Sequence, residues 1–412
     1  MSATLPDLAG APWLTAAPVQ HVFTALSADG HEVRIVGGAV RNALMQRPVG
    51  EIDFATTATP DEVARLAAAA GMKTVPTGVE HGTQTVISEG TAFEVTTLRE
   101  DIETDGRHAV VRFGTDWAAD ARRRDFTINA LSVDRDGTVH DPVDGCADIV
   151  ARRVRFIGEA DQRIAEDRLR ILRFFRFSAE YGGGALDAAG LAASIRARDG
   201  LRQLSAERIG NEMRRLVVAP AADVVAAAMQ DAGLLPIVLG GIGYVACFAR
   251  LVAFERVLDA APTVPLRLAC RIAEDAGRVA TRLRLANAER DAILAMLDGR
   301  IGLLPPPEGK AARAALYRRG ADFWHGGVRL AFADSGAAVD DPAWRALDTL
   351  PERWTPPVFP LSGRDVLNSA LSPGPAVGAL LRDLEAWWVA EDFAPDAVAL
   401  RTRLQQMIAS VQ

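Results

Sequence analysis

Arg34-Ile35-Val36-Gly37-Gly38-Ala39-Val40-Arg41 and, after a short helical segment, Glu51-Ile52-Asp53-Phe54-Ala55-Thr56-Thr57 decide the expected fold. Val33 to Val36 has the apolar pattern of a buried strand. The glycine pair that follows lets backbone N–H groups approach a bound anion where a helix begins. Arg41 comes in the first turn of that helix and could face the same anion. This half of the stretch predicts a phosphate-binding turn.

The second half alternates as a strand does. Glu51, Asp53 and Ala55 share one face, so two like charges stand close together with no counter-charge between them. Such a pair is unfavourable unless a cation neutralises it, and Mg²⁺ prefers hard oxygen ligands together with phosphate oxygens. The stretch therefore predicts metal-assisted phosphoryl or nucleotidyl transfer. The alternative is a loop followed by two solvated acids on an edge strand.

The composition is that of a globular chain too long for one core. The chain has 412 residues, of which 49% are hydrophobic and 24% charged. A net charge of −7 excludes a global positive field, so any nucleic-acid contact must come from local arginines. All basic residues except Lys73 and Lys310 are arginine, which suits bidentate phosphate contacts.

The cysteines and apolar segments indicate a cytoplasmic protein. The three cysteines are far apart, which argues against a zinc site or a disulfide framework and for a reducing compartment. Met1 to Thr15 lacks the pattern of a signal peptide. Gly233 to Ala249 is uncharged, but its proline and glycines predict a buried helical hairpin and no membrane span. The sequence does not fix the oligomeric state.

The rest of the N-terminal region predicts a mixed α/β head. Leu14 to Leu26 has the pattern of one amphipathic helix, and Thr59 is a good N-cap for a second. The expected strands after it are 74–79, 83–88 and 92–98. Glu94 on the last of these is either a surface residue or a third carboxylate beside the acidic strand, and three acids could hold a metal pair. The polar segment 101–120 predicts a loop.

Two further segments carry polar side chains at helical spacing. In 122–131, Asp125 and Asn129 would project from one side of a helix. In 166–177, a single predicted helix places Asp167 beside Arg170 at i and i+3, which is also the spacing of an ordinary surface salt pair. Beyond residue 221 the chain is rich in Ala and Leu at helical spacing, and proline-rich breaks interrupt it.

These motifs together resemble the class II tRNA nucleotidyltransferase (CCA-adding enzyme) / poly(A) polymerase family. The resemblance is strong over about residues 30–216, weaker in the tail, and rests on motifs that occur in the family's order: Gly37-Gly38-Ala39-Val40-Arg41, the acidic strand, Phe93-Glu94-Val95-Thr96-Thr97-Leu98-Arg99, Asp105-Gly106-Arg107-His108-Ala109, Arg123-Arg124-Asp125-Phe126-Thr127-Ile128-Asn129-Ala130, Glu166-Asp167 with Arg170, and Glu207-Arg208-Ile209-Gly210-Asn211-Glu212. It implies an α+β fold: a small mixed-sheet, polymerase-β-like nucleotidyltransferase head at 1–158, then an all-α neck (159–220), body (221–304) and tRNA-binding tail (305–412).

The resemblance also implies the roles of the site residues. Glu51 and Asp53 would carry Mg²⁺, with Glu94 as the third catalytic acid. The family usually has Asp where this chain has Glu51, so the metal geometry must adjust to a longer side chain. The nucleotide-binding set that it implies is Gly37, Gly38, Arg41 and Arg124 for the phosphates, Asp125 and Asn129 for the ribose, Asp167 and Arg170 for the base, and Arg173. Residues 207–212 would brace the base-recognition helix.

The implied activity is the template-independent addition of C, C and A to the 3′ end of tRNA from CTP and ATP. Alternatives of the same class are a poly(A) polymerase or an enzyme that adds only CC or only A. The segment Asp105–His108 resembles one that CC-only enzymes lack, which favours full addition. An alternative of another class is a non-catalytic tRNA-binding homologue.

Overall fold

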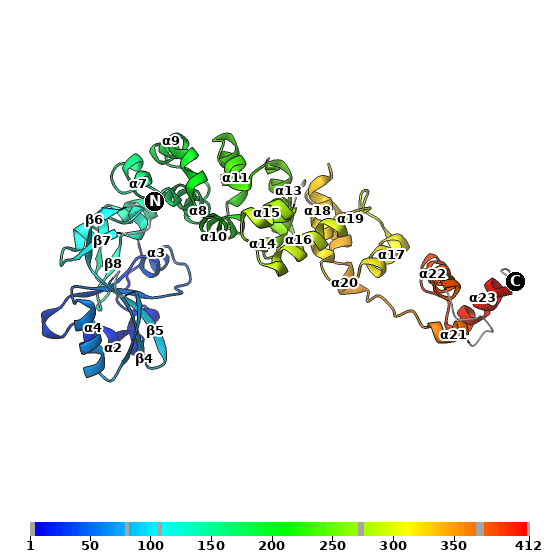
Figure 1. Ribbon diagram of the computed structural model, residues 1–412, viewed down its shortest axis with the longest axis horizontal. Coiled ribbons are helices and arrows are strands. Elements are labelled where there is room, and N and C mark those ends of the chain that lie inside the picture. Colours follow the sequence, from blue (N-terminus) through cyan, green and yellow to red (C-terminus); the bar gives the residue numbers. More distant parts are fainter. Residues whose placement is uncertain are drawn as a thin grey trace. The chain divides into compact units, whose positions relative to one another are not determined.

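The computed structural model describes residues 5–78, 82–104, 109–241, 243–270, 276–367 and 375–409. The chain divides into two compact units (Figure 1). The first comprises Met1–Ile242 with Arg282–Arg284, and the second comprises Gly243–Thr281 with Leu285–Gln412.

A mixed sheet forms the head of the first unit, as the sequence predicted. Its strands lie in the order β3-β4-β5-β2-β1-β8-β9. Their bounds are β1 Val33–Val36, β2 Asp53–Thr56, β3 Lys73–Gly78, β4 Thr83–Ser88, β5 Thr91–Thr97, β8 Ser132–Val133 and β9 Val139–His140. β2 runs parallel to β5 and antiparallel to β1. The acidic strand therefore lies inside the sheet, between two partners, and not at an edge.

Helices cover the sheet through an aromatic core. The head helices are α1 Pro12–Thr15, α2 Ala17–Leu26, α3 Gly38–Leu44, α4 Pro60–Ala69, α5 Trp117–Arg122 and α6 Gly145–Val150, with 3₁₀ turns η1 Ala28–Gly30 and η3 Thr127–Asn129. Phe54 of β2 meets Phe23 of α2 and Phe93 of β5 edge to face, with ring centroids 5.1 and 5.6 Å apart. The predicted N-cap of α4 is confirmed, because the backbone N–H of Thr59 donates to Glu62 at 2.7 Å in a capping box.

Three local predictions in the head were wrong. The single helix over 14–26 is two helices, because Ala16 is extended (φ −58°, ψ 136°). Segment 101–120 is not a loop: β6 Arg99–Thr104 and β7 Ala109–Phe113 form an antiparallel pair, and α5 follows. Such pairing rests on backbone hydrogen bonds and needs no apolar alternation. The acidic strand begins at Asp53 and leaves Glu51 before it. Asp105–His108 lies outside the described residues.

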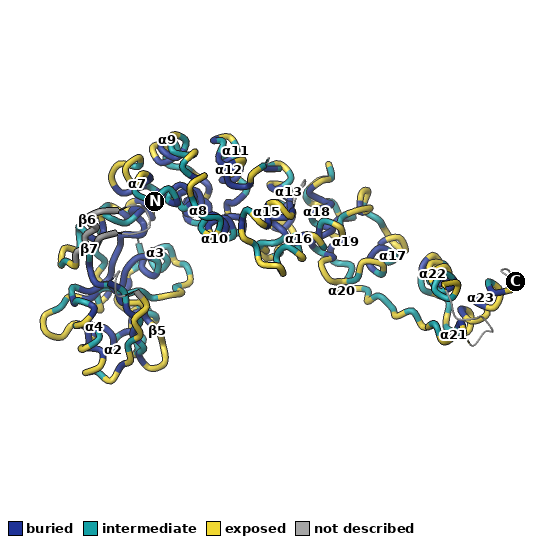
Figure 2. Tube along the Cα trace, in the orientation of Figure 1, coloured by how far each residue is buried: buried dark blue, intermediate teal, exposed yellow. Residues whose placement is uncertain are grey.

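The remaining helices of the first unit follow the head along the chain. Their bounds are α7 Ala160–Glu166, α8 Leu169–Tyr181, α9 Ala188–Ala197, η4 Arg198–Gln203, α10 Ala206–Val217, α11 Ala222–Asp231 and α12 Leu235–Leu239. α8 is the central one, and most of it is buried (Figure 2). Its Leu172, Phe174 and Phe175 are fully buried. Because Asp167 is extended (φ −150°, ψ 112°), the predicted helix over 166–177 is interrupted there, and α7 and α8 are separate.

The second unit is helical, as expected. Its helices are α13 Val245–Val257, α14 Val264–Ala269, α15 Ala276–Arg282 (whose last residue is assigned to the first unit), α16 Asn287–Gly299, α17 Gly309–Arg319, α18 Trp324–Asp334, α19 Pro342–Asp348, α20 Leu350–Arg353, α21 Gly363–Leu367, α22 Pro375–Ala390 and α23 Ala397–Ala409. Trp344 and Trp388 anchor two hydrophobic clusters within it. Among the described helices, none is long and apolar enough to cross a membrane.

Candidate nucleotide-binding site

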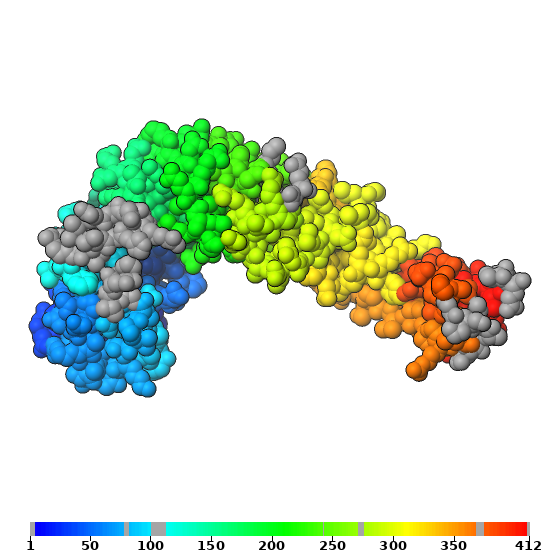
Figure 3. Space-filling view, in the orientation of Figure 1, coloured from blue at the N-terminus to red at the C-terminus, as the bar shows by residue number. Residues whose placement is uncertain are grey.

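A pocket of about 1060 Å³ lies in the first unit, where the head meets the neck helices (Figure 3). It brings together every candidate site residue except Glu51: Gly37, Gly38, Arg41, Asp53, Glu94, Arg124, Asp125, Asn129, Asp167, Arg170 and Arg173. Nine arginines and five carboxylates line it, and its described lining contains no lysine. This excess of positive charge suits a ligand with several negative charges.

The glycine turn exposes backbone to the pocket. Gly37 has φ 69° and ψ −118°, a conformation that other residues rarely adopt, and its N–H donates to the Leu131 carbonyl at 3.0 Å. A Cβ at position 37 would lie 3.3 Å from Nη1 of Arg124. Glycine at this position therefore serves both the turn and the close approach of Arg124.

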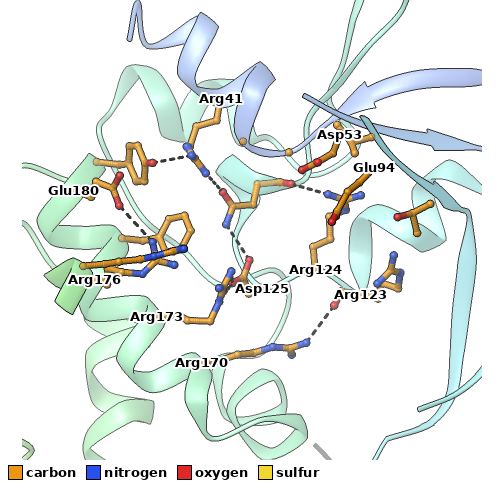
Figure 4. Close-up of a pocket in the computed structure, with 18 of the residues that line it drawn as sticks. Arg41, Asp53, Glu94, Arg123, Arg124, Asp125, Arg170, Arg173, Arg176 and Glu180 are labelled. Carbon is orange, nitrogen blue, oxygen red and sulfur yellow. Dashed lines mark hydrogen bonds and ion pairs between the residues drawn. The ribbon is translucent and has the colours of Figure 1, made fainter. Parts of the chain in front are cut away.

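The acidic pair stands on two neighbouring strands. Asp53 of β2 and Glu94 of β5 are register partners, so their carboxylates lie side by side above Arg124 (Figure 4). Burial raises the pKa of Asp53, the negative charges of Glu94 and Glu51 raise it further, and Arg124 opposes them. Glu51 is exposed and acts on Asp53 electrostatically from the segment before the strand.

The donor chemistry at this pair fits Mg²⁺ in part. Among the described residues, no three His, Cys, Asp or Glu side chains lie close enough to hold a metal by themselves. Two adjacent carboxylates whose repulsion Arg124 relieves only in part suit Mg²⁺ when phosphate oxygens and water complete its shell. The residues therefore fit an ion that arrives with a phosphate ligand, and they do not form a closed protein cage.

Arg124 is held by a carboxylate that the sequence interpretation missed. Asp120, which is 4% exposed, accepts from Arg123 (Nε, 2.9 Å) and from Arg124 (Nη2, 3.1 Å). Burial alone would raise the pKa of Asp120, but the two guanidinium groups outweigh burial and lower it. The i, i+4 spacing of Asp120 and Arg124 was the available signal.

Asp125 and Asn129 do not lie on a helix, which corrects the prediction for 122–131. α5 ends at Arg122, and Asn129 closes a 3₁₀ turn. The two side chains still meet, because Nδ2 of Asn129 donates to Oδ1 of Asp125 at 3.0 Å. Nε of Arg173 donates to the other carboxylate oxygen at 2.6 Å, and Nη1 of Arg41 donates to Oδ1 of Asn129 at 2.5 Å. A continuous polar chain thus joins α3 to α8 (Figure 4).

Asp167 and Arg170 both line the pocket, and they do not form the surface salt pair that was the alternative interpretation of their spacing. Nη2 of Arg208 donates to Asp167 at 2.6 Å, and the N–H of Leu169 donates to its other oxygen at 3.0 Å. Arg170 pairs with Glu166 instead. The backbone N–H of Arg170 still donates to the Asp167 carbonyl at 3.0 Å, but Asp167 itself is extended, and its side chain is held by Arg208 of α10 instead of by Arg170.

The expected bracing by residues 207–212 corresponds to two contacts. Arg208 holds Asp167, as described above, and Oε2 of Glu212 accepts from Nε of Arg176 of α8 at 2.6 Å. Both contacts tie α10 to the segment that supplies Asp167 and Arg173.

Comparison with known proteins identifies the family. Residues 33–155 match the poly A polymerase head domain. The chain is 35% identical over 376 residues to the CCA tRNA nucleotidyltransferase 1, mitochondrial, of Mus musculus, covering 87% of this chain and 83% of that protein. It is 30% identical over 375 residues to the CCA-adding enzyme of Levilactobacillus brevis, covering 88% and 91%. The chain belongs to the CCA-adding tRNA nucleotidyltransferase family.

Solved structures of this family share the fold. The Bacillus stearothermophilus CCA-adding enzyme in complex with CTP superposes with a TM-score of 0.71 at 26% identity, over 96% of this chain and 99% of that chain. The Thermotoga maritima enzyme complexed with tRNA gives 0.72 at 16% identity over the whole of both chains, which shows the fold alone. As a family member the protein is a nucleotidyltransferase.

Proposed function

We propose that this nucleotidyltransferase adds C, C and A to the 3′ end of tRNA, using CTP and ATP. The observation that best supports this proposal is the pair of acids Asp53 and Glu94 in a pocket that arginines and a glycine turn also line. Relatives named CCA-adding enzyme support the product, and one of them was solved with CTP. In this reaction the RNA 3′-hydroxyl attacks the α-phosphate and pyrophosphate leaves.

The acidic side chains would bind Mg²⁺, and the arginines would bind the negatively charged phosphates. Asp53 and Glu94, with Glu51 from the preceding segment, would hold Mg²⁺, which when bound neutralises charge at the reacting phosphate. Arg124 and Arg41 would contact the phosphates, and Gly37-Gly38 keeps the turn free of side chains that would block them. These contacts orient the α-phosphate and stabilise the charge that develops on the leaving pyrophosphate.

The row of hydrogen-bonded side chains that joins Arg41, Asn129, Asp125 and Arg173 would supply the ribose contacts. Asp125 and Asn129 present a carboxylate and an amide to the pocket, and ribose hydroxyls can donate to or accept from such groups. Arg173 holds Asp125, and together with Asn129 it outweighs the effect of burial and keeps the pKa of Asp125 low, so the acid stays ionised. We therefore assign Arg173 to orienting the ribose contact.

Asp167 and Arg170 would select the base. Cytosine and adenine each present an amino donor beside a ring-nitrogen acceptor, whereas guanine and uracil present the reverse pattern. A carboxylate accepts from the amino group and a guanidinium donates to the ring nitrogen. Arg208 and Glu166 hold these two side chains in the structure and would set their orientation. A wrong base leaves buried polar groups unmatched, which costs about 1–3 kcal/mol each.

The remaining assignments follow from the same family. We propose a head at 1–158, a neck at 159–220, a body at 221–304 and a tRNA-binding tail at 305–412. The three cysteines are free thiols, which is consistent with the proposed cytoplasmic location.

Addition to tRNA that lacks its 3′ CCA tests the function directly. The purified protein with Mg²⁺, CTP and ATP should restore CCA, as sequencing of the products would show. Products ending in CC, in A alone or in a poly(A) run would support the alternative transferases. No product, with retained tRNA binding but no Mg²⁺-linked nucleotide binding, would mean a non-catalytic homologue.

A matched pair of variants locates the chemistry. Asp53→Ala should abolish addition and leave tRNA affinity nearly unchanged. Asp61→Asn removes an exposed acid on α4 outside the pocket and should keep full activity. Activity retained by Asp53→Ala would exclude the metal role.

A further inference from the structure

Arg41 is a buried cation that forms no ion pair with a carboxylate among the described residues. Arg41 is 7% exposed, and its guanidinium donates to three neutral oxygens: Asn129 at 2.5 Å, Asn42 at 3.0 Å and Tyr181 at 2.7 Å. Burial lowers the pKa of Arg41, while Glu180 and Asp125 act on it only through space. A buried charge without an opposite charge is costly. The site therefore favours an anion that enters the pocket lined by Arg41.

Tyr181 is the largest of the three neutral partners. It stands at the C-terminal end of α8, is 6% exposed, and its ring centroid lies 4.0 Å from Cζ of Arg41. Cζ of Arg47 lies 4.8 Å from the same ring, and Nη2 of Arg47 donates to the Glu180 carbonyl at 2.7 Å. Burial raises the pKa of Tyr181 to about 12, so its phenol stays neutral at physiological pH. The ring thus stabilises two cations without neutralising either of them.

We propose that Tyr181 is a positioning residue: its ring and phenolic oxygen hold the Arg41 guanidinium at the pocket wall, where it receives an oxygen of the nucleotide's polyphosphate. The identity of the anion rests on the proposed function. A carboxylate in place of Tyr181 would fix Arg41 equally well but would cancel the charge that the phosphate needs. A tyrosine fixes the side chain and leaves its charge available.

The inference predicts a defect in nucleotide binding that does not depend on the base. Tyr181→Phe removes the oxygen and keeps the ring, so KM should rise roughly threefold to tenfold. Tyr181→Leu removes both and should raise KM roughly tenfold or more. The increase should be equal for CTP and ATP, with kcat little changed, because uniform binding is lost. A merely structural role would instead lower the active fraction, and therefore kcat, at unchanged KM.

A remote variant and a second ligand serve as controls for this experiment. Tyr317→Phe removes a phenol oxygen in the second unit, where it donates to Glu385, and should leave KM unchanged. Inhibition by tripolyphosphate, which has no base or sugar, should weaken in both Tyr181 variants by the same factor as nucleotide binding. If Tyr181→Leu fails to fold, the phenylalanine variant decides.

The outcomes separate this inference from the proposed function. Addition by the wild type with unchanged KM in the Tyr181 variants overturns the inference alone. Tripolyphosphate binding that the variants weaken, in a protein that adds no nucleotide, overturns the proposed function and supports the role of Tyr181. A wild type that neither adds nucleotide nor binds tripolyphosphate overturns both.

Discussion

Replacing Asp53 by Asn should make the protein slightly more stable while it removes activity. Neighbouring strands lie about 4.8 Å apart, so the register partners Asp53 and Glu94 hold two like charges about 5 Å from each other. In a water-like dielectric that repulsion is worth about 0.8 kcal/mol, and Arg124 offsets part of it. For a unit of this size the gain corresponds to a melting temperature roughly 1–3 °C higher.

The pH dependence has a definite sign. Because the folded-state pKa of Asp53 is raised, its ionised form opposes folding above that pKa, and the opposition is relieved as the pH falls through it. The melting temperature of Asp53→Asn should therefore exceed that of the wild type at neutral pH, and the difference should disappear in acid.

Thermal melts in EDTA test this prediction, with Asp61→Asn as the matched control for loss of one acid. Added Mg²⁺ with CTP should stabilise the wild type by binding and should do so much less for the variant. A variant that melts below the wild type in EDTA at neutral pH would refute the reasoning, since Asp53 would then be satisfied by protein contacts alone.

Other changes have separable effects. Asp120→Ala leaves two guanidinium groups without their buried acid and should lower the free energy of unfolding, measured in urea, by about 3 kcal/mol. In the wild type this stabilisation is lost as the pH falls through the lowered pKa of Asp120. A variant as stable as the wild type would contradict this role of Asp120. Gly37→Ala forces a left-handed φ on alanine, at about 1–3 kcal/mol, and should raise KM for both nucleotides in steady-state assays; unchanged KM would argue against the turn's role. Asp167→Ala should raise misincorporation of UTP and GTP roughly tenfold in competition assays, and unaltered selectivity would remove Asp167 from base recognition. The affinity for tRNA in filter binding should fall steeply between 50 and 200 mM salt, and a flat profile would exclude arginine–phosphate contacts as its source.

The sequence predicted the elements whose signals are local. Val33–Val36 is a strand with the predicted bounds and Thr59 caps α4, because periodicity and capping chemistry act over a few residues. The β6–β7 pair was missed because pairing depends on a partner strand, which polar composition conceals. The breaks at Ala16 and Asp167 were missed for a related reason: apolar periodicity continues through both.

The site could be predicted as a set of residues but not as a set of contacts. The motifs named eleven of the residues that line the pocket, since each motif contributes side chains from one short segment. Asp120 and Tyr181 were missed as partners, and Arg208 was expected only to brace the base-recognition helix, because individual side-chain contacts form when the chain folds. Asp167 illustrates the limit: its place in the pocket was predicted, and its partner, 41 positions away along the chain, was not.

All basic side chains in the described lining of the pocket are arginines, and this has a practical consequence for handling the protein. The two lysines, Lys73 on β3 and Lys310 on α17, are exposed, stand in different units and do not line the pocket. Amine-directed dyes or resin linkers that react with these two side chains should therefore leave the nucleotide site unmodified. A guanidine-selective reagent such as phenylglyoxal should modify the arginines of the nucleotide site, and bound nucleotide should protect these arginines from it.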